Sequence, residues 1–533
     1  MPTTESAVSM HLHLLDWAVI AAYAVGVLGA GWYFSRRNTS TDDYLVGGRN
    51  MSPWTVGLSF FVAVFSTLTY LSRPGDMVQN GPYVLAGLTA VPLIYFIVGW
   101  FIIPVFMRLK ITSGNELLER RLGLAVRQTG VTFFLLMRLL WMALILFATV
   151  NMVVIPMVGA DPSHGWWICI LVAAITIVYT SMGGLKAIVA IDTAQSLLLF
   201  GGVLLTLGLI AYYLGGPMEF IPNQWVDGWA ELRWVSASGE GGQRPVLALF
   251  SSMLFWYVCT AGSDQMAIQR YAATKDAAAA RKMFGISMMA GIAIQFLLCV
   301  LGLALLAYSL AKPEFLPPGE TALSMSDKLF PHFIITVLPA GLSGLIIAGL
   351  LAEAMNSLSS GVSATGSIVV TDLINRFRKH ASTPERDITM AKWVSVLLGV
   401  LVVLLSSVMS LVSGNLFELS QKVVNLFVAP LFGLFFMAIF IRFATPTGTL
   451  VGAAVGVCVA ATINYWPDFT GNPSPISFLW AMPASLLTQI VVGIIVSLVA
   501  GGQTAYERDP EGFDADREEQ AAQFSGKPVV EGN

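Results

Sequence analysis

The amino-acid sequence predicts an all-α integral membrane protein with about 13 transmembrane helices. Of its 533 residues, 56% are hydrophobic and only 11% are charged, whereas a soluble domain carries about 25% charged residues. The mean hydropathy is +0.73. The apolar residues occur in long blocks, and about 20 such residues are enough to cross a bilayer. A water-soluble globular protein is thereby excluded, and the lipid bilayer is the expected surrounding of most of the chain.

The rest of the composition excludes further classes of protein. The formal net charge is −3, and acidic residues gather in the tail at 503–533, so no basic region is left to bind nucleic acid. The four cysteines lie in apolar runs and the five histidines are scattered, which disfavours a disulfide framework or a metal-ligand motif. No HExxH, GxSxG or paired-carboxylate motif is present, so no enzyme is predicted. Nothing in the sequence indicates an obligate protein partner.

Thirteen apolar blocks, bounded by charges, prolines or glycines, define the expected spans. The first block has no Lys or Arg before it, which favours an uncleaved first span over a signal peptide. The blocks lie at 15–35, 52–72, 82–107, 128–157, 164–181, 187–214, 246–269, 284–311, 338–370, 389–412, 419–441, 446–465 and 478–500.

The distribution of Lys and Arg predicts the orientation of these spans. With the N-terminus outside and the C-terminus in the cytoplasm, most of the 29 basic residues fall in cytoplasmic segments, as the positive-inside rule requires. Those counted as cytoplasmic include Arg108, Arg120, Arg121, Arg127 and Arg270, whereas Arg73 is counted as external. The expected location is a plasma or inner membrane, crossed many times.

Two spans carry small polar residues at mid-depth, where a helix facing lipid would have none. Ser66, Thr67 and Thr69 interrupt the second span, and Thr260 and Asp264 interrupt the seventh. Helices broken at corresponding positions of two halves are typical of transport sites. Alternatively, the hydroxyls bond to their own helix and a glycine permits close packing.

The spacing of these breaks predicts an inverted repeat of five helices plus five, with broken first and sixth core helices. Residues 1–51 then form the external N-terminus, a first peripheral helix and a cytoplasmic loop. Residues 52–445 form the core, with repeats at 52–214 and 246–441. Residues 446–502 add two peripheral helices, and 503–533 form an acidic cytoplasmic tail.

The ninth span has the densest cluster of polar residues. Asn356, Ser357, Ser359 and Ser360 share one face of the predicted helix, and Glu353 precedes them by one turn. Such oxygens suit a monovalent cation, because they can replace its hydration shell and still release it. Small residues at this spacing also let helices pack closely, and the sequence alone leaves both interpretations open.

Two charged residues inside the spans need partners. Arg138 lies eleven residues beyond Arg127, about 16 Å along a helix, and a buried arginine in a membrane suggests function. It could bind an anionic group through its planar fork, or serve as counter-ion to Glu353. Asp192, just inside the sixth span, could be a functional acid or one that caps the helix at the interface.

Four passages resemble the sodium:solute symporter family, whose members carry sugars, sialic acid, iodide, proline or monocarboxylates. The passages are SFFVAVFSTLTYLSRPGD at 59–76, YTSMGGLKAIVAIDTAQ at 179–195, SDQMAIQRYAATKDAAAARK at 263–282 and SGLIIAGLLAEAMNSLSSGVSATGSIVVTD at 343–372. The resemblance covers residues 15–500. It implies the five-plus-five inverted-repeat fold and alternating access by a rocking bundle.

By matching positions, the resemblance implies a principal sodium site. The main-chain oxygens of Val62 and Phe65 would join a contribution from Glu353 and the side chains of Asn356 and Ser357. Asn356 replaces a more usual hydroxyl, and Glu353 stands where the family tends to have a small residue. A second sodium site, known in some members, would match Asp192, Asn356, Ser359 and Ser360.

The resemblance places the solute site beside the two breaks. Thr69 and Tyr257 stand where the sugar carriers have amides, which disfavours a hexose, while Arg138 matches the depth of an arginine that holds a carboxylate in the sialic acid carriers. The candidate residues are Ser66, Thr67, Thr69, Arg138, Tyr257, Thr260, Asp264, Gln421 and Asn425.

The expected function is therefore sodium-coupled import of a small organic solute, with a carboxylate or acidic sugar favoured and Na+ as the required ion. The sequence leaves two alternatives open. Asp192, Asp264 and Glu353 could relay protons in a proton-coupled carrier, and the same fold could serve a membrane sensor that transports nothing.

Overall fold

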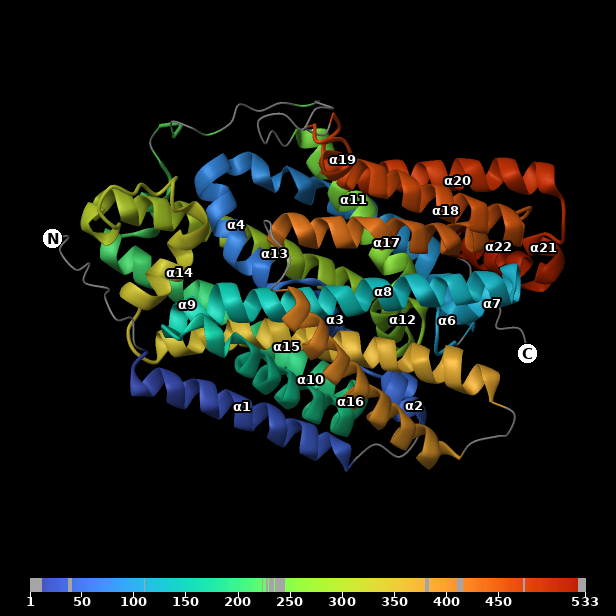
Figure 1. Ribbon diagram of the computed structural model, residues 1–533, viewed down its shortest axis with the longest axis horizontal. Coiled ribbons are helices and arrows are strands. Elements are labelled where there is room, and N and C mark those ends of the chain that lie inside the picture. Colours follow the sequence, from blue (N-terminus) through green and yellow to red (C-terminus); the bar gives the residue numbers. More distant parts are fainter. Residues whose placement is uncertain are drawn as a thin grey trace.

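The computed structural model describes residues 12–36, 41–109, 111–222, 224–226, 229, 234, 245–378, 383–409, 416–472 and 475–525. Within these ranges the chain is helical and contains no β-strand. Most of the helices run side by side along the long axis of the molecule (Figure 1). The side chains of 416–425 lie outside the described part of the structure.

The helices that surround the predicted sites are long and mostly apolar. Their bounds are α1 (Leu14–Ser35), α3 (Pro53–Val64), α4 (Thr67–Asn80), α6 (Ile103–Leu109), α8 (Leu124–Ala148), α10 (Gly165–Leu214), α11 (Val246–Ser263), α12 (Gln265–Ala272), α13 (Ala277–Ala311), α15 (Leu342–Ile368), α16 (Pro384–Met409), α17 (Leu416–Phe440), α18 (Pro446–Asn464) and α20 (Ala481–Ala500).

Shorter helices connect these elements or cover their ends. They are α2 (Thr41–Val46), α5 (Val91–Ile97), α7 (Asn115–Leu122), α9 (Ile155–Val158), α14 (Ser326–Thr336), α19 (Trp466–Thr470), α21 (Ala505–Arg508) and α22 (Pro510–Ser525). A 3-10 segment at Pro82–Ala90 and a π-helical turn at Val98–Ile102 complete the helical span that ends at Leu109.

Among the described residues, ten helices are long and apolar enough to cross a bilayer, or eleven if the bent pair α3 and α4 is one span. Two features separate this number from the predicted thirteen. The blocks at 164–181 and 187–214 lie in the single element α10, and the described side chains of α17 form only a shorter apolar helix, Leu426–Phe440. The number thirteen stays a prediction.

Element α10 turns at Gly184. Its 50 residues would extend about 75 Å as one straight helix, far beyond the ~30 Å of a hydrocarbon core. Gly184 has φ +59° and ψ −162°, a backbone conformation open essentially to glycine alone. A Cβ at this position would lie 2.8 Å from Tyr44. The glycine thus permits both the turn and the close approach of α2.

The interruptions predicted in the second and seventh spans are confirmed as breaks between helices. α3 and α4 meet at an angle of 71°, and extended residues Phe65 and Ser66 lie between them. α11 ends at Ser263, and Asp264 is the extended N-cap of α12. In both places a polar side chain caps the second helix, because Ser66 accepts from the Thr69 amide and Asp264 from the Met266 amide.

Helix α15 lies at the centre of the packed helices. In its most apolar stretch, 89% of the residues are buried, and its neighbours include α1, α3, α8, α10, α12 and α16. Figure 1 shows α15 between α8 and α10, with α1 at the edge of the molecule. Polar side chains on α15 are therefore enclosed by protein rather than by lipid.

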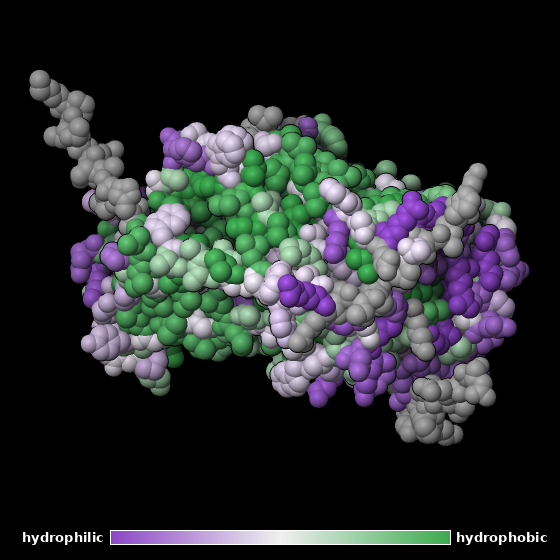
Figure 2. All heavy atoms as spheres, turned by 90° about the horizontal axis from the view of Figure 1, so that it is seen from below, coloured by the Kyte–Doolittle hydropathy of each residue, from purple (hydrophilic) through white to green (hydrophobic). Residues whose placement is uncertain are grey.

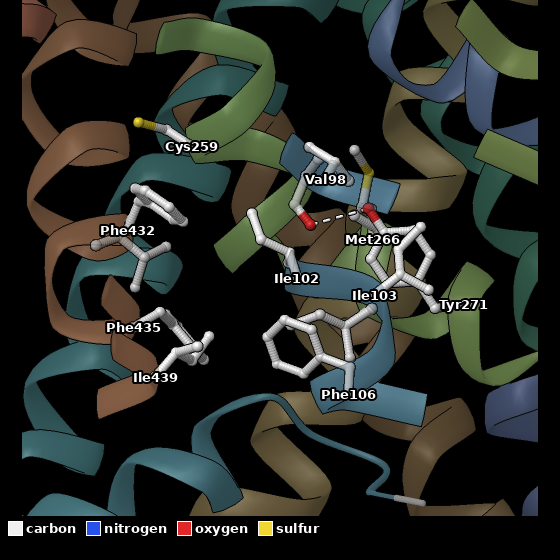
Figure 3. Close-up of a cluster of buried hydrophobic side chains, with 14 of the residues drawn as sticks. Val98, Ile102, Ile103, Phe106, Cys259, Met266, Tyr271, Phe432, Phe435 and Ile439 are labelled. Carbon is white, nitrogen blue, oxygen red and sulfur yellow. Dashed lines mark hydrogen bonds between the residues drawn. The ribbon is translucent and has the colours of Figure 1, made fainter. Parts of the chain in front are cut away.

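A hydrophobic core holds the break of α11 and α12 in place. Figure 3 shows side chains from several elements meeting there. They include Met266 and Tyr271 of α12, Ile102 and Phe106 from the span that ends at Leu109, and Phe432 and Phe435 of α17, all of them buried. This packing fixes the position of Asp264.

Polar residues concentrate at one end of the molecule, beyond a broad apolar surface (Figure 2). At this end the tail segment with α21 and α22 pairs with arginines of the core, of which Arg121 is fully buried. Asp516 pairs with Arg108 and Arg121, and Asp509 pairs with Arg120 and Arg121. The tail predicted at 503–533 is therefore partly helical and packed over its described residues.

Some of the arginines counted as cytoplasmic are buried inside the protein. Arg121 and Arg270 have no exposed surface, and Arg127 is 6% exposed. Each of them has at least one acidic partner inside the protein. Charge counting along the sequence locates such residues by span boundaries, and it cannot distinguish a solvated loop from a buried ion pair.

Candidate functional site

The break between α3 and α4 exposes backbone groups in the centre of the protein. α3 ends at Val64, and Ser66 has φ −135° and ψ 150°, so the carbonyls of the last turn of α3, including that of Val62, lack their helical partners. Val62 and Phe65 are buried. Thr67 donates from its hydroxyl to the carbonyl of Leu350 in α15 at 3.3 Å. This hydrogen bond connects the start of α4 to α15.

The polar face predicted on α15 is buried. Glu353, Asn356, Ser359 and Ser360 have no exposed surface, and Ser357 is 2% exposed. Among the described residues, both carboxylate oxygens of Glu353 and both amide atoms of Asn356 lack a hydrogen-bond partner. Ser359 donates to the carbonyl of Asn356 at 3.1 Å. Unsatisfied buried oxygens of this kind are costly unless something binds them.

Asp192 lies in a buried network with Arg270. Its Oδ2 accepts from Ser59 Oγ at 2.6 Å and from Arg270 Nη2 at 3.3 Å. Arg270 Nη2 also donates to Ser360 Oγ at 2.6 Å. The other oxygen, Oδ1, has no hydrogen-bond partner among the described residues. Asp192 is therefore a buried acid and not a cap at the membrane interface.

Arg138 pairs with Asp264, and the prediction that it could be the counter-ion of Glu353 is wrong. Arg138 Nη2 donates to Asp264 Oδ2, and both residues are buried. The pair joins α8 to the junction between α11 and α12. Sequence spacing gives the depth of Arg138, but it does not say which helix its side chain faces.

Two cavities lie beside the breaks. The larger, about 240 Å³, is lined by candidates Ser66, Thr69 and Tyr257, and also by Arg73, which was counted as an external residue and not as a site residue. The smaller, about 50 Å³, is lined by Arg138, Thr260 and Asp264. The lining residues common to both are Val64, Phe65, Trp141 and Trp256.

The structure thus brings most candidates together. Thr67 lines neither cavity, because its hydroxyl faces α15. Gln421 and Asn425 lie among the side chains that the structure does not describe. Sequence reasoning missed Ser59 and Arg270, although the glutamine–arginine pair in AIQRY was part of a quoted motif and could have indicated Arg270.

The fold and this centre define a class of protein. The chain is a helical membrane protein in which two interrupted helices flank a buried polar region with adjoining cavities. This is the arrangement of a secondary transporter, since backbone breaks at membrane depth are tolerated where protein or a cavity surrounds them.

Comparison with known proteins identifies the family. The sodium:solute symporter family model matches residues 44–456, so the chain belongs to this family and is a transporter rather than an enzyme. A sodium/sialic acid symporter of Proteus mirabilis is 29% identical over 475 residues, covering 86% of this chain and 92% of the relative. The human sodium-coupled monocarboxylate transporter 1 is 26% identical, with 84% and 73% covered.

Solved structures agree with this assignment. The chain is similar to a Na+-coupled sialic acid symporter in a substrate-bound outward-open state, with a TM-score of 0.79, 26% identity, and 91% of this chain and 98% of the other covered. It also shares its fold with Mhp1, a nucleobase-cation-symport-1 family transporter, at a TM-score of 0.56 and 13% identity, with 90% and 99% covered. Membership of the family makes Na+ the coupling ion.

The residues around α15 fit a sodium ion. The available ligands are carboxylate, amide, hydroxyl and freed main-chain oxygens, which suit a hard monovalent cation. The side chains of Glu353 and Asn356 have unsatisfied oxygens. No sulfur ligand is needed, and among the described residues no cluster of His, Cys, Asp and Glu of the kind that holds a transition metal is found.

Proposed function

We propose that the chain is a sodium-coupled symporter that imports a small organic solute, with a carboxylate or acidic sugar favoured. One observation carries the proposal, namely the charge balance of the buried centre. Asp192 is paired with Arg270 and Asp264 with Arg138, which leaves Glu353 without a basic partner among the described residues. A buried carboxylate needs a compensating positive charge, and one bound sodium ion supplies it.

The proposed principal site follows from the position of Glu353. It comprises the main-chain oxygens of Val62 and Phe65 with Glu353, Asn356 and Ser357. Binding there would link the break of α3 and α4 to α15, because these ligands come from both elements. An ion at this place favours the arrangement in which the two elements are close, which is how ion binding can complete an adjoining solute site.

The proposed second site, made by Asp192, Asn356, Ser359 and Ser360, has a competing cation. Arg270 already donates to Asp192 and to Ser360. A second sodium ion there requires the guanidinium of Arg270 to withdraw from at least one of these oxygens. The geometry of the described residues therefore favours one ion per cycle, bound at the principal site.

The proposed transport cycle is alternating access in a fold of thirteen spans, with repeats at 52–214 and 246–441 and the N-terminus outside. Two capped breaks in elements of the two halves support this reading, as does the shared fold with a sodium-coupled carrier. One sodium ion moving together with a carboxylate carries no net charge, so the sodium concentration gradient drives uptake, and a tenfold gradient releases about 1.4 kcal/mol.

The proposed solute site comprises Ser66, Thr69, Arg138, Tyr257, Thr260 and Asp264, with Thr67, Gln421 and Asn425 as further candidates. The first six residues line the two adjoining cavities. Relatives named for sialic acid and for monocarboxylates support an acidic solute.

The test is thermal unfolding of the purified full chain in sodium and in potassium. We expect sodium alone to raise the apparent melting temperature, because it binds the folded state, and Glu353→Gln and Ser357→Ala to lose this shift. Ser309→Ala is the matched control, since this buried hydroxyl bonds to a carbonyl of its own helix α13.

A sodium shift that survives in both site variants would place the ion elsewhere. If acidification but not sodium stabilises the parent protein, a proton-coupled carrier replaces the proposal. If ligands bind without any transport into vesicles, the sensor interpretation replaces it.

A further inference from the structure

We propose that Arg73, rather than Arg138, supplies the positive charge that holds the carboxylate of the transported solute. This inference rests on the proposed function and names the residue that selects the solute. Arg73 lies on α4, seven residues beyond Ser66, which is about 10 Å along a helix. It is therefore two turns from the break, in the wider of the two cavities.

The charge of Arg138 is already compensated. Arg138 makes a direct ion pair with Asp264 in the smaller cavity. The volume there is about 50 Å³, which leaves little room for a carboxylate beside that of Asp264. An incoming anion would also have to displace a buried partner, and breaking such a pair is costly.

Some N–H donors of Arg73 have no hydrogen-bond partner among the described residues. A guanidinium carries five N–H donors, and Arg73 uses Nη2 to donate to Gln295 Oε1 at 3.2 Å. Its Nε is buried and has no hydrogen-bond partner among the described residues. Asp76 Oδ2 lies 3.8 Å from Nη1, beyond the 2.7–3.2 Å of an N–H···O hydrogen bond. Asp76 thus moderates the charge of Arg73 and leaves its remaining donors available.

The surroundings of Arg73 suit a small organic acid. Among the described residues, Arg73 is the one charged residue that lines the 240 Å³ cavity, where the hydroxyls of Ser66, Thr69 and Tyr257 can bond to polar groups of a ligand. Trp141 and Trp256 provide apolar faces. The planar guanidinium of Arg73 offers charged N–H donors, which a carboxylate can accept. The volume is below the ~300 Å³ at which pockets for drug-sized ligands begin, so a short-chain hydroxy acid fits best.

The experiment compares each acid with its uncharged analogue. Binding of lactate and lactamide, and of sialic acid and its methyl ester, is measured on the purified full chain in sodium. We expect lactate to bind more tightly than lactamide, and Arg73→Gln to weaken lactate binding about 10- to 100-fold, as loss of a charged hydrogen bond does, without affecting lactamide. Sialic acid is the larger carboxylate, and its binding tests whether the 240 Å³ cavity excludes large acids.

For a second variant, Asp76→Asn, the proposal predicts tighter lactate binding, which is opposite to the effect of Arg73→Gln. Asp76→Asn removes the acid near Arg73, so we expect lactate binding to tighten while lactamide binding stays the same. A structural role of Arg73 alone would not produce this improvement. A sodium-induced rise in the melting temperature of each variant shows that the fold and the ion site, which does not include these residues, are intact.

Three results would overturn the inference. They are unchanged lactate binding in Arg73→Gln, loss of the preference for acid over amide in Arg138→Gln alone, and a parent protein that neither carboxylate stabilises. Carboxylate binding that depends on Arg73 but is equal in sodium and potassium would contradict sodium coupling. It would still support Arg73 as the residue that binds the carboxylate. The two proposals therefore fail in different ways.

Discussion

At the scale of single residues, the buried centre is governed by charge pairing. The sequence predicts that Arg138, Asp192, Asp264 and Glu353 are important, because charged residues within a span are expensive. It does not predict the pairs, since partners such as Arg138 and Asp264 are 126 positions apart. It also places Arg270 in a loop, because that residue follows an apolar block directly. The positions of the candidates could be read from the sequence, but not their contacts.

The pair of Arg138 and Asp264 is expected to be essential for stability. Asp264→Asn keeps an acceptor for the Met266 amide that caps α12, but it leaves the buried Arg138 without a counter-charge. Removal of one partner of a buried ion pair costs about 3–5 kcal/mol, so the apparent melting temperature should fall clearly.

The matched control is the double variant Asp264→Asn with Arg138→Gln. It removes both charges and should recover part of the lost stability, which a thermal unfolding series would detect. If the double variant is the least stable of the set, charge compensation is not the reason for the loss.

At the scale of elements, the sequence predicts the two breaks between helices. For the turn at Gly184 it predicts the gap between two spans, but not the contact that requires glycine there. Ser66, Thr67 and Asp264 are polar residues in apolar spans, and capping residues in such places indicate helix ends. The gap between the blocks at 164–181 and 187–214 also indicates two spans. The contact with α2 that makes glycine necessary at 184 is invisible in the sequence, because Tyr44 is far away along the chain.

Substitution of Gly184 tests this turn. Gly184→Ala must accept a backbone conformation that costs about 1–3 kcal/mol for a residue with a side chain, and the new Cβ meets Tyr44. We expect a lower melting temperature than in Gly201→Ala, the matched control within α10, where no atom lies within 4 Å of the new Cβ. In that control, alanine should be neutral or stabilise the helix by up to about 1 kcal/mol. Equal stability of the two variants would contradict the role of Gly184.

At the scale of the whole molecule, the acidic tail packs against one end of the molecule and pairs there with the buried Arg121. Arg121 has no exposed surface, donates to Asp509 and Asp516, and lies 4.1 Å from the ring centre of Phe513. Composition identifies the tail as acidic, but it does not reveal that Asp509 and Asp516 pair with the buried Arg121. That arrangement depends on the docked position of the helix.

Removal of these two carboxylates is expected to destabilise the whole protein. Asp509→Asn with Asp516→Asn leaves Arg121 buried and unpaired, which should lower the melting temperature of the full chain by more than loss of surface charge does. Glu511→Gln with Glu518→Gln is the charge-matched control, because both glutamates are exposed on the same helix. A similar melting temperature for the two double variants would show that the tail contributes nothing through these pairs.

The contact between Arg138 and Asp264 also has a kinetic consequence. One residue belongs to α8 and the other to the junction of α11 and α12, so any motion that parts these elements must first separate two buried opposite charges. The free energy of that separation favours the arrangement in which the pair is closed and slows its opening. The pair therefore acts as a latch between α8 and the junction of α11 and α12.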